Sequence, residues 1–129
     1  MGTFLTPALK SPQSGFSLVN DRTGLPIVTE LEVAVDSASR RKGLLGRDQL
    51  SETTGIVIAP TNAVHTFFMR FPIDIVFVTR EGRVVKVLSA VPARRVAIAL
   101  RAFAVVELAA GCAARQDLQP GDIVSVRPA

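Results

Sequence analysis

The stretch that decides the fold is AVHTFFMRFPIDIVFV, which spans residues 63–78 and contains the only histidine of the chain, His65. From Ile73 to Val78 every residue except Asp74 is apolar. A strand that is apolar on both faces is typical of a position covered on both sides. A buried carboxylate must be paired, hydrogen-bonded or protonated. The stretch therefore predicts a central strand with a site near Asp74, and it indicates no particular reaction.

The whole chain has the length and composition of one domain. It has 129 residues, of which 48% are hydrophobic, and a chain of this size buries a core without disulfides or metals. The single cysteine, Cys112, excludes an internal disulfide framework. We see no leader-like apolar run and no run long enough to span a bilayer. We therefore expect a cytoplasmic protein with no membrane partner.

The positive charge of the chain is spread rather than concentrated. The formal net charge is +4, and the basic residues form small groups such as Arg40–Lys42 and Arg94–Arg95. No tract has the density of a nucleic-acid-binding arm, and no glycine-rich phosphate-binding spacing is present. The sequence thus argues against a nucleic-acid partner, and we expect no cofactor.

The pattern of strands and turns predicts a mainly β protein. Residues 1–15, rich in Pro, Ser and Gly, predict a flexible N-terminal arm, and residues 16–129 a single β-rich domain. Many short strands with two short helices favour an α+β fold with a small antiparallel barrel-like or folded sheet. An α+β sandwich with the helices on one face is the alternative. The expected strands cover 16–19, 25–35, 55–59, 73–78, 84–88, 103–109 and 123–126, and the expected helices cover 38–45 and 111–118; residues 96–99 are too short to classify.

Glu107 is a second acid of the same kind as Asp74, because it also lies inside an apolar strand. One interpretation is structural, with each acid bound to an arginine or to turn amides. The other is functional, with His65, Asp74 and Glu107 converging on a ligand in a cleft. Alternation over residues 103–109 places Glu107 on the bulkier face of its strand, so we expect it to be buried and paired with Arg47.

Cys112 opens two further alternatives. Together with His65 and Met69 it offers the ligands of a soft metal, but three residues of this kind are an incomplete set, so we expect no metal. Cys112 also follows a glycine at the start of a predicted helix, where the thiol pKa is lowered, and His65 could serve as its base. A buried cysteine that acts as a small hydrophobe is the simpler interpretation.

An ordered set of motifs resembles a known family. The motifs are RKGLLGR at residues 41–47, Gly55, HTFFMRFPID at 65–74, ELAAG at 107–111 and PGD at 120–122. The set is similar to the uncharacterised family known as domain of unknown function 192, and it covers residues 28–127. The resemblance implies a small, mainly β domain of no established activity. It also implies that the signature positions here are Gly43, Arg47, Met69, Asp74, Glu107, Gly111 and Asp122, whereas Cys112 stands where threonine or another small residue is usual.

Three functions stay open at this point. The first is a domain that binds a small molecule or a short peptide in one polar pocket. The second is a small hydrolase-like enzyme that uses the same residues, with His65 or an acid as general base. The third is a structural or interaction module whose buried acids only stabilise the fold. The pocket residues predicted for the first two are His65, Met69, Asp74, Glu107 and Arg47.

Overall fold

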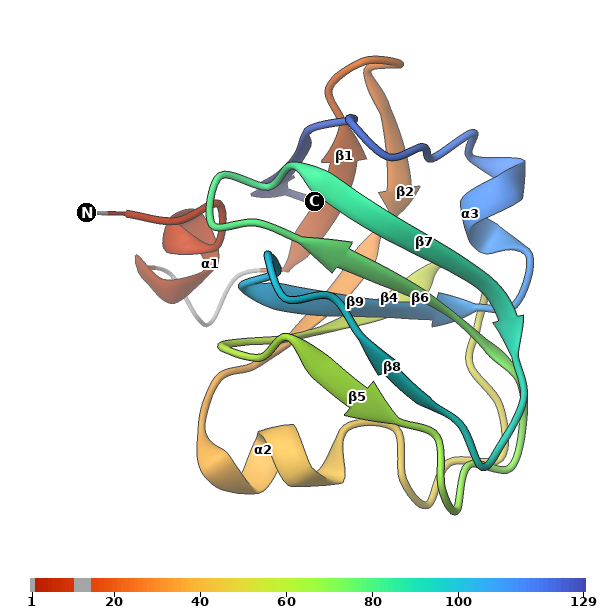
Figure 1. Ribbon diagram of the computed structural model, residues 1–129. Coiled ribbons are helices and arrows are strands. Elements are labelled where there is room, and N and C mark those ends of the chain that lie inside the picture. The colour runs from red at the N-terminus through yellow and green to blue at the C-terminus, as the bar shows by residue number, and fades with distance from the viewer. Residues whose placement is uncertain (1, 11–14) are drawn as a thin grey trace.

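The computed structural model describes residues 2–10 and 15–129, which form ten strands and three short helices (Figure 1). The elements run in the order α1 (Thr6–Lys10), β1 (Phe16–Asn20), β2 (Leu25–Val28), β3 (Glu30–Ala34), α2 (Ser37–Lys42), β4 (Thr54–Ile58), β5 (Ala63–His65), β6 (Ile73–Val78), β7 (Val84–Val91), β8 (Val96–Ile98), β9 (Ala104–Ala109), α3 (Cys112–Arg115) and β10 (Val124–Pro128).

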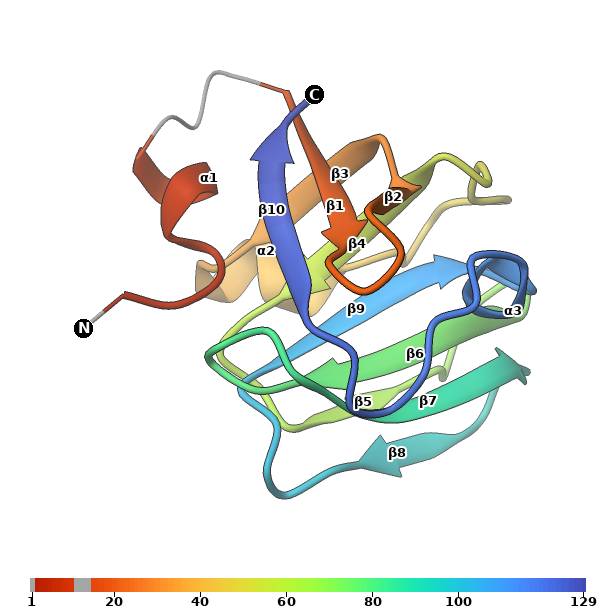
Figure 2. The ribbon, with the colours of Figure 1, turned by 90° about the horizontal axis from the view of Figure 1, so that it is seen from above.

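The strands form three sheets. A five-stranded sheet has the order β3-β4-β9-β6-β7, a three-stranded sheet the order β10-β1-β2, and β5 pairs with β8 in a two-stranded ribbon. All pairings are antiparallel except that of β3 with β4. Figure 2 shows the three-stranded sheet on one side of the five-stranded sheet and β8 on the other. The predicted fold class, mainly β with short helices, is confirmed, and the described strands do not close into a barrel.

Strands β6 and β9 form the centre of the molecule, since every residue of both is buried. Their alternate side chains enter two separate cores. What we call the large core lies between the five-stranded and three-stranded sheets and also takes in α1 and α3. What we call the small core lies on the opposite face, against the β5–β8 ribbon and the segment after α2. From β6 the large core receives Val76 and Val78, and the small core receives Ile73, Ile75 and Phe77.

The N-terminal arm differs from its prediction. Residues 6–10 form helix α1, and Phe4, Leu5 and Ala8 are buried in the large core. The amide of Phe4 also donates a hydrogen bond of 2.8 Å to the carbonyl of Arg80. The apolar residues of this segment outweigh its turn-forming composition, so residues 2–10 and 15–129 form three short helices where two were expected. Residues 1 and 11–14 of the predicted arm lie outside the described residues.

Two further boundaries were predicted wrongly. The strand expected over residues 25–35 is broken at Thr29, and its second half, β3, pairs in parallel with β4. The helix expected over 38–45 ends earlier, because Gly43 adopts a left-handed φ of 43° and caps it. The unclassified segment at 96–99 forms β8. No helix in the described part of the chain is long and apolar enough to cross a membrane.

Candidate functional site

Asp74 is fully buried and is held by backbone amides rather than by a basic side chain. Its Oδ1 accepts hydrogen bonds from the amides of Ala90 (2.8 Å) and Gly111 (3.2 Å), and its Oδ2 accepts one from the amide of Ala113 (2.9 Å). The carboxylate thus joins β6 to the end of β7 and to the start of α3. With at least three donors, its burial is compensated by hydrogen bonds, which is the structural interpretation made from the sequence.

Asp74 and Glu107 lie on opposite faces of the five-stranded sheet. In the antiparallel pairing of β6 with β9, Asp74 stands opposite Leu108, and Ile75 stands opposite Glu107. Residues directly opposite each other share a face. Asp74 therefore points to the large core and Glu107 to the side of the small core. The predicted convergence of His65, Asp74 and Glu107 is wrong for Asp74, because the two acids are one residue out of phase on neighbouring strands.

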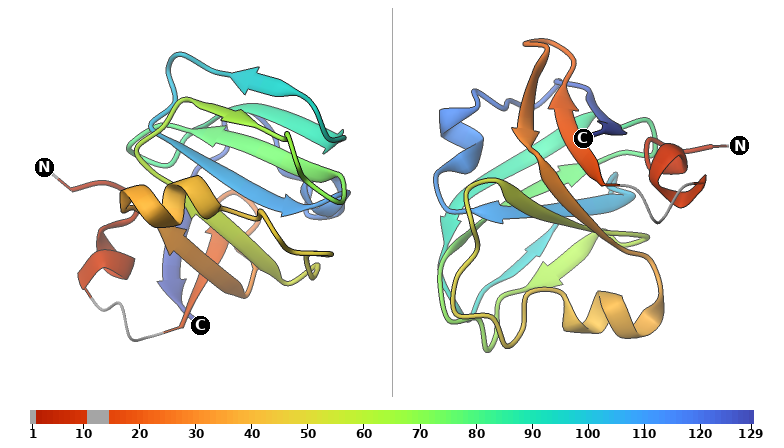
Figure 3. Two further views of the ribbon diagram at one scale, coloured as in Figure 1. Left: turned by 90° about the horizontal axis from the view of Figure 1, so that it is seen from below. Right: turned by 180° about the vertical axis from the view of Figure 1, so that it is seen from behind.

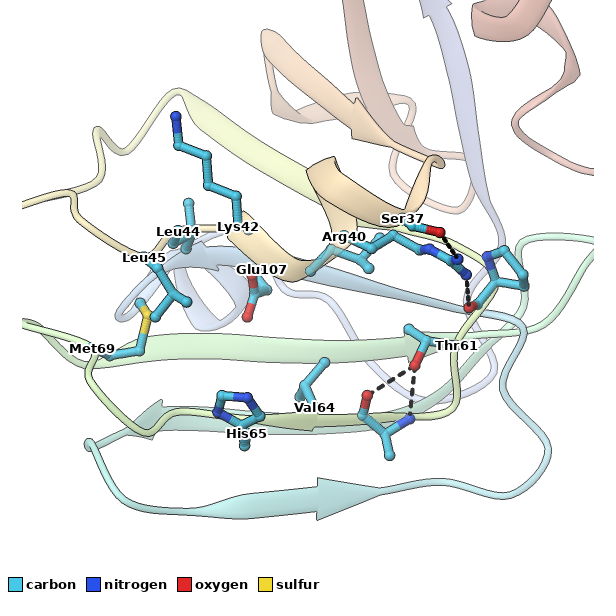
Figure 4. A pocket seen from close by; sticks show the side chains of 14 residues that line it. Ser37, Arg40, Lys42, Leu44, Leu45, Thr61, Val64, His65, Met69 and Glu107 are labelled. Atoms are coloured by element: carbon cyan, nitrogen blue, oxygen red, sulfur yellow. Dashed lines mark hydrogen bonds between the residues drawn. The ribbon is translucent and has the colours of Figure 1, made fainter.

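A cavity of about 520 Å³ lies between α2 and β5, on the side of the small core. Figure 4 shows α2 and the segment after it above this pocket, β5 below it, and Glu107 from β9 at its back. Figure 3 shows from two further directions that α2 and β5 lie on the same side of the molecule. Most of the pocket wall is apolar. The lining includes Leu44, Leu45, Ile58, Ala63, Val64 and Met69, with Ser37, Arg40, Lys42, Thr61, His65 and Glu107 as the polar members.

Glu107 is the buried acid of this pocket. Only 5% of the residue is exposed, and among the described residues its carboxylate has no hydrogen-bond or ion-pair partner. Burial raises the pKa of Glu107 from an ordinary 4.5 to about 7. The end of α2 lies beside this carboxylate: a Cβ on Gly43 would be 3.6 Å from Oε1 of Glu107, in ordinary van der Waals contact. Glu107 thus presents a carboxylate to the cavity that no other group of the described chain neutralises.

Residues 18–126 match the family model of DUF192, described as Uncharacterized ACR, COG1430. The chain belongs to the DUF192 family. The resemblance noted in the sequence is confirmed, and it brings no activity with it. No curated protein matches the chain.

Two solved structures share the fold of this DUF192 chain. A protein of unknown function from Novosphingobium aromaticivorans DSM 12444 is 27% identical, with a TM-score of 0.74 over 85% of this chain and 82% of that one. A protein named "putative transcription regulator" from Sinorhizobium meliloti 1021 is 22% identical, with a TM-score of 0.75 over 86% of this chain and 91% of that one. At that identity the second likeness shows the fold alone.

Arg47 is not the partner of Glu107 in this DUF192 chain, so that prediction is wrong. Its guanidinium binds Glu32 on β3 with both terminal nitrogens, Nη2 to Oε1 at 2.6 Å and Nη1 to Oε2 at 3.0 Å. This hydrogen-bonded pair lowers the pKa of Glu32. Because α2 ends at Gly43, the turns that follow bury Leu44 and direct Arg47 toward the sheet edge instead. Arg47 does not line the pocket.

Of the five predicted pocket residues, His65, Met69 and Glu107 do line the cavity. His65 is exposed on β5, and its ring lies 5.7 Å from that of Phe67. Sequence reasoning missed the contribution of α2, whose Arg40 and Lys42 line the pocket. Arg40 is held at the pocket by the carbonyl of Pro60 (3.2 Å) and Oγ of Ser37 (3.4 Å). The signal that could have indicated this side of the pocket is the RKGLLGR motif, whose Gly43, Leu44 and Leu45 line the cavity.

Two other signature positions have structural roles. Gly111 has a φ of 90°, a conformation that favours glycine, and it donates its amide to Asp74. Asp122 is buried and accepts hydrogen bonds from the Nδ2 of Asn20 (3.0 Å), the Nε of Arg22 (2.7 Å) and the amide of Gln119 (2.8 Å). Asp122 therefore fastens the turn before β10 to the end of β1.

Cys112 belongs to the large core, on the other side of the central sheet from the pocket. Its Sγ lies 3.6 Å from the carbonyl oxygen of Ile27, and burial raises the pKa of the thiol. The idea of a thiol activated at a helix start is therefore wrong, because desolvation outweighs the position. His65 does not face Cys112 across a shared site. In the described part of the chain no three His, Cys, Asp or Glu residues are grouped so as to hold a metal ion.

Proposed function

We propose that the cavity between α2 and β5 binds a small molecule or a short peptide, and that Glu107 accepts a hydrogen bond from it. The observation that carries this proposal is the buried carboxylate of Glu107, which has no partner among the described residues and faces a cavity of about 520 Å³. Ligand pockets are commonly of this size, with mostly apolar walls and a few convergent polar groups.

The energetics of Glu107 support the same proposal. An acid that is buried without a partner lowers the stability of the folded state, because the ionised form has lost its hydration. A ligand that donates a hydrogen bond to the carboxylate recovers part of this loss. The recovered free energy then contributes to the binding of that ligand. Asp74 provides the contrast, since its amide donors leave it nothing to offer a ligand.

A second candidate function is a small hydrolase-like enzyme with Glu107 as general base. The observation that favours it is the pKa of Glu107, raised by burial to about 7, because a general base works best with a pKa near the ambient pH. His65 lines the same cavity and could orient a water or a substrate. The two functions share the pocket, and turnover of a bound ligand distinguishes them.

The wider setting of the proposal rests on composition. The one cysteine is a buried free thiol, which is compatible with the reducing conditions of the cytoplasm. The basic residues are dispersed and several are held in ion pairs, such as Arg70 with Asp48 and Arg22 with Asp122, which argues against a nucleic-acid partner. We place the protein in the cytoplasm as part of this proposal.

The test is a ligand screen read by thermal unfolding, since a ligand that binds only the folded state raises the melting temperature. The library holds small amines, alcohols, amides, acids and short peptides. We expect at least one class to stabilise the wild type, and to have no effect on Glu107→Leu. The control is Asp48→Asn, which changes an exposed acid that does not line this pocket. Stabilisation of Glu107→Leu equal to that of the wild type, or of neither protein by any compound, would contradict the proposal.

A further inference from the structure

We infer that the group recognised by Glu107 is a protonated primary amine carried on a small apolar body. This inference rests on the proposed function and names the chemical class of its ligand.

None of the described cations at or near the pocket forms an ion pair with Glu107. Arg40 bonds to Pro60 and Ser37, and Arg47 binds Glu32. Lys42 is exposed, and Figure 4 shows its chain extending away from Glu107. The carboxylate of Glu107 is therefore left without a counterion by the described chain. A cation supplied from outside fills this position better than a neutral donor, because charge-assisted hydrogen bonds are roughly twice as strong as neutral ones.

The surroundings of the carboxylate fit a compact donor. The missing Cβ of Gly43 leaves room beside Oε1, and the Cδ1 of Ile58 borders the same space, 3.6 Å from where that Cβ would be. Val64 points up toward Glu107 from β5, and Leu45 and Met69 line the cavity further out (Figure 4). An ammonium group is a compact cation, so it fits beside the carboxylate. Its alkyl chain can then lie along these apolar side chains.

Binding of an ammonium ion to Glu107 should depend on pH, because only the ionised carboxylate attracts it. With a pKa of about 7, the fraction of Glu107 that is ionised falls about 30-fold between pH 8 and pH 5.5. Affinity for an ammonium ion should fall by the same factor. A neutral hydrogen-bond acceptor would do the reverse, since it needs the protonated acid. The other basic residues that line the pocket, among those described, are Arg40 and Lys42 on α2 and His65 on β5.

The experiment measures dissociation constants by calorimetry on the full chain at pH 5.5, 7 and 8. The probes are n-butylamine, n-butanol, butyramide and n-butyrate. We expect n-butylamine to bind at pH 8 at least tenfold more tightly than the other three, and to weaken about 30-fold at pH 5.5. Glu107→Gln should lose the preference for the amine and its pH dependence. Asp48→Asn, which changes an exposed acid outside the pocket lining, should keep both.

Two peptide probes distinguish the source of the amine, which is either a free small molecule or a peptide N-terminus. A leucyl-glycyl-glycine tripeptide is compared with its N-acetylated form, and binding of the free form alone assigns the site to a peptide amine as well. The inference is overturned if the alcohol or the amide binds the wild type as tightly as the amine, in a manner lost in Glu107→Leu; the proposed pocket would then stand without its assigned ligand class. It is also overturned if no amine binds, or if Glu107→Gln binds the amine as the wild type does.

Discussion

Asp74 and Glu107 lie on neighbouring strands of one sheet and point to opposite faces of it, because Asp74 stands opposite Leu108 whereas Glu107 stands opposite Ile75. The two acids have opposite surroundings. Asp74 accepts three amide hydrogen bonds, and Glu107 has no partner in the described chain. Asp74 should therefore stabilise the fold. Glu107 should destabilise it, because its buried carboxylate is kept available for a ligand.

Replacement of Asp74 by alanine should destabilise the protein strongly. The change leaves the amides of Ala90, Gly111 and Ala113 without their acceptor, and an unsatisfied buried group costs about 1–3 kcal/mol. We expect a loss of about 3 kcal/mol or more in the free energy of unfolding, measured by urea denaturation. Asp48→Ala removes a carboxylate whose side chain is 82% exposed and serves as the control. Equal losses in the two variants would show that the amide contacts of Asp74 contribute nothing.

Glu107 should make the protein less stable as the pH rises. Its pKa is raised to about 7 in the folded state, so between pH 4.5 and pH 7 the folded chain binds more protons than the unfolded chain. The stability of the wild type relative to Glu107→Gln should thus fall by about 2–3 kcal/mol between pH 5 and pH 8, and level off above that range. Urea denaturation of both proteins across this range checks the slope. A constant difference between them would mean that Glu107 titrates alike in both states.

The ion pair of Arg47 with Glu32 should contribute little to stability. Both side chains are partly exposed, at 32% and 46%, and such pairs are typically worth less than about 1 kcal/mol. A double-mutant cycle with Arg47→Ala and Glu32→Ala should give a coupling energy below about 1 kcal/mol that shrinks in added salt. Neither single change should alter the titration of Glu107. A coupling of several kcal/mol would show that the exposed geometry is misleading.

Cys112 should react slowly with thiol reagents in the folded protein. Its thiol is buried in the large core, and burial raises its pKa, so the reactive thiolate is scarce. We expect modification by a disulfide reagent at pH 7.5 to be at least about tenfold slower than that of glutathione, and to become fast in denaturant. Rapid labelling of the native protein would place the thiol at the surface.

The strands were predictable because their patterns are local. The apolar run of Ile73–Val78 and the alternation around Glu107 fixed both strands as central and both acids as buried, and the structure agrees. The phase between the two strands was not predictable from either one alone. Register is set by pairing between segments far apart in the chain, and a shift of one residue exchanges the faces. For that reason the sequence placed Asp74 and Glu107 in one cleft.

The choice of ionic partners failed for a related reason. Arg47 was assigned to Glu107 from the residue types alone, and Glu32 was equally available to it. The decision depends on where α2 ends, and it ends before Gly43 instead of at residue 45 as expected. A helix end that moves by one turn redirects every side chain after it. The contribution of α2 to the pocket was not predicted for a similar reason. It depends on the position of the helix relative to β5, which no local pattern gives.

The central sheet separates the large core from the pocket, and this separation affects which substitutions the protein can tolerate. Asp74, which fastens β6 to β7 and to α3 through backbone amides, points to the large core, whereas Leu45, Ala63 and Met69 line the pocket and are only half-buried. Substitutions at such separated sites usually act independently on stability. A library confined to these three positions should therefore yield mostly folded proteins, in which ligand preference diverges while the scaffold stays the same.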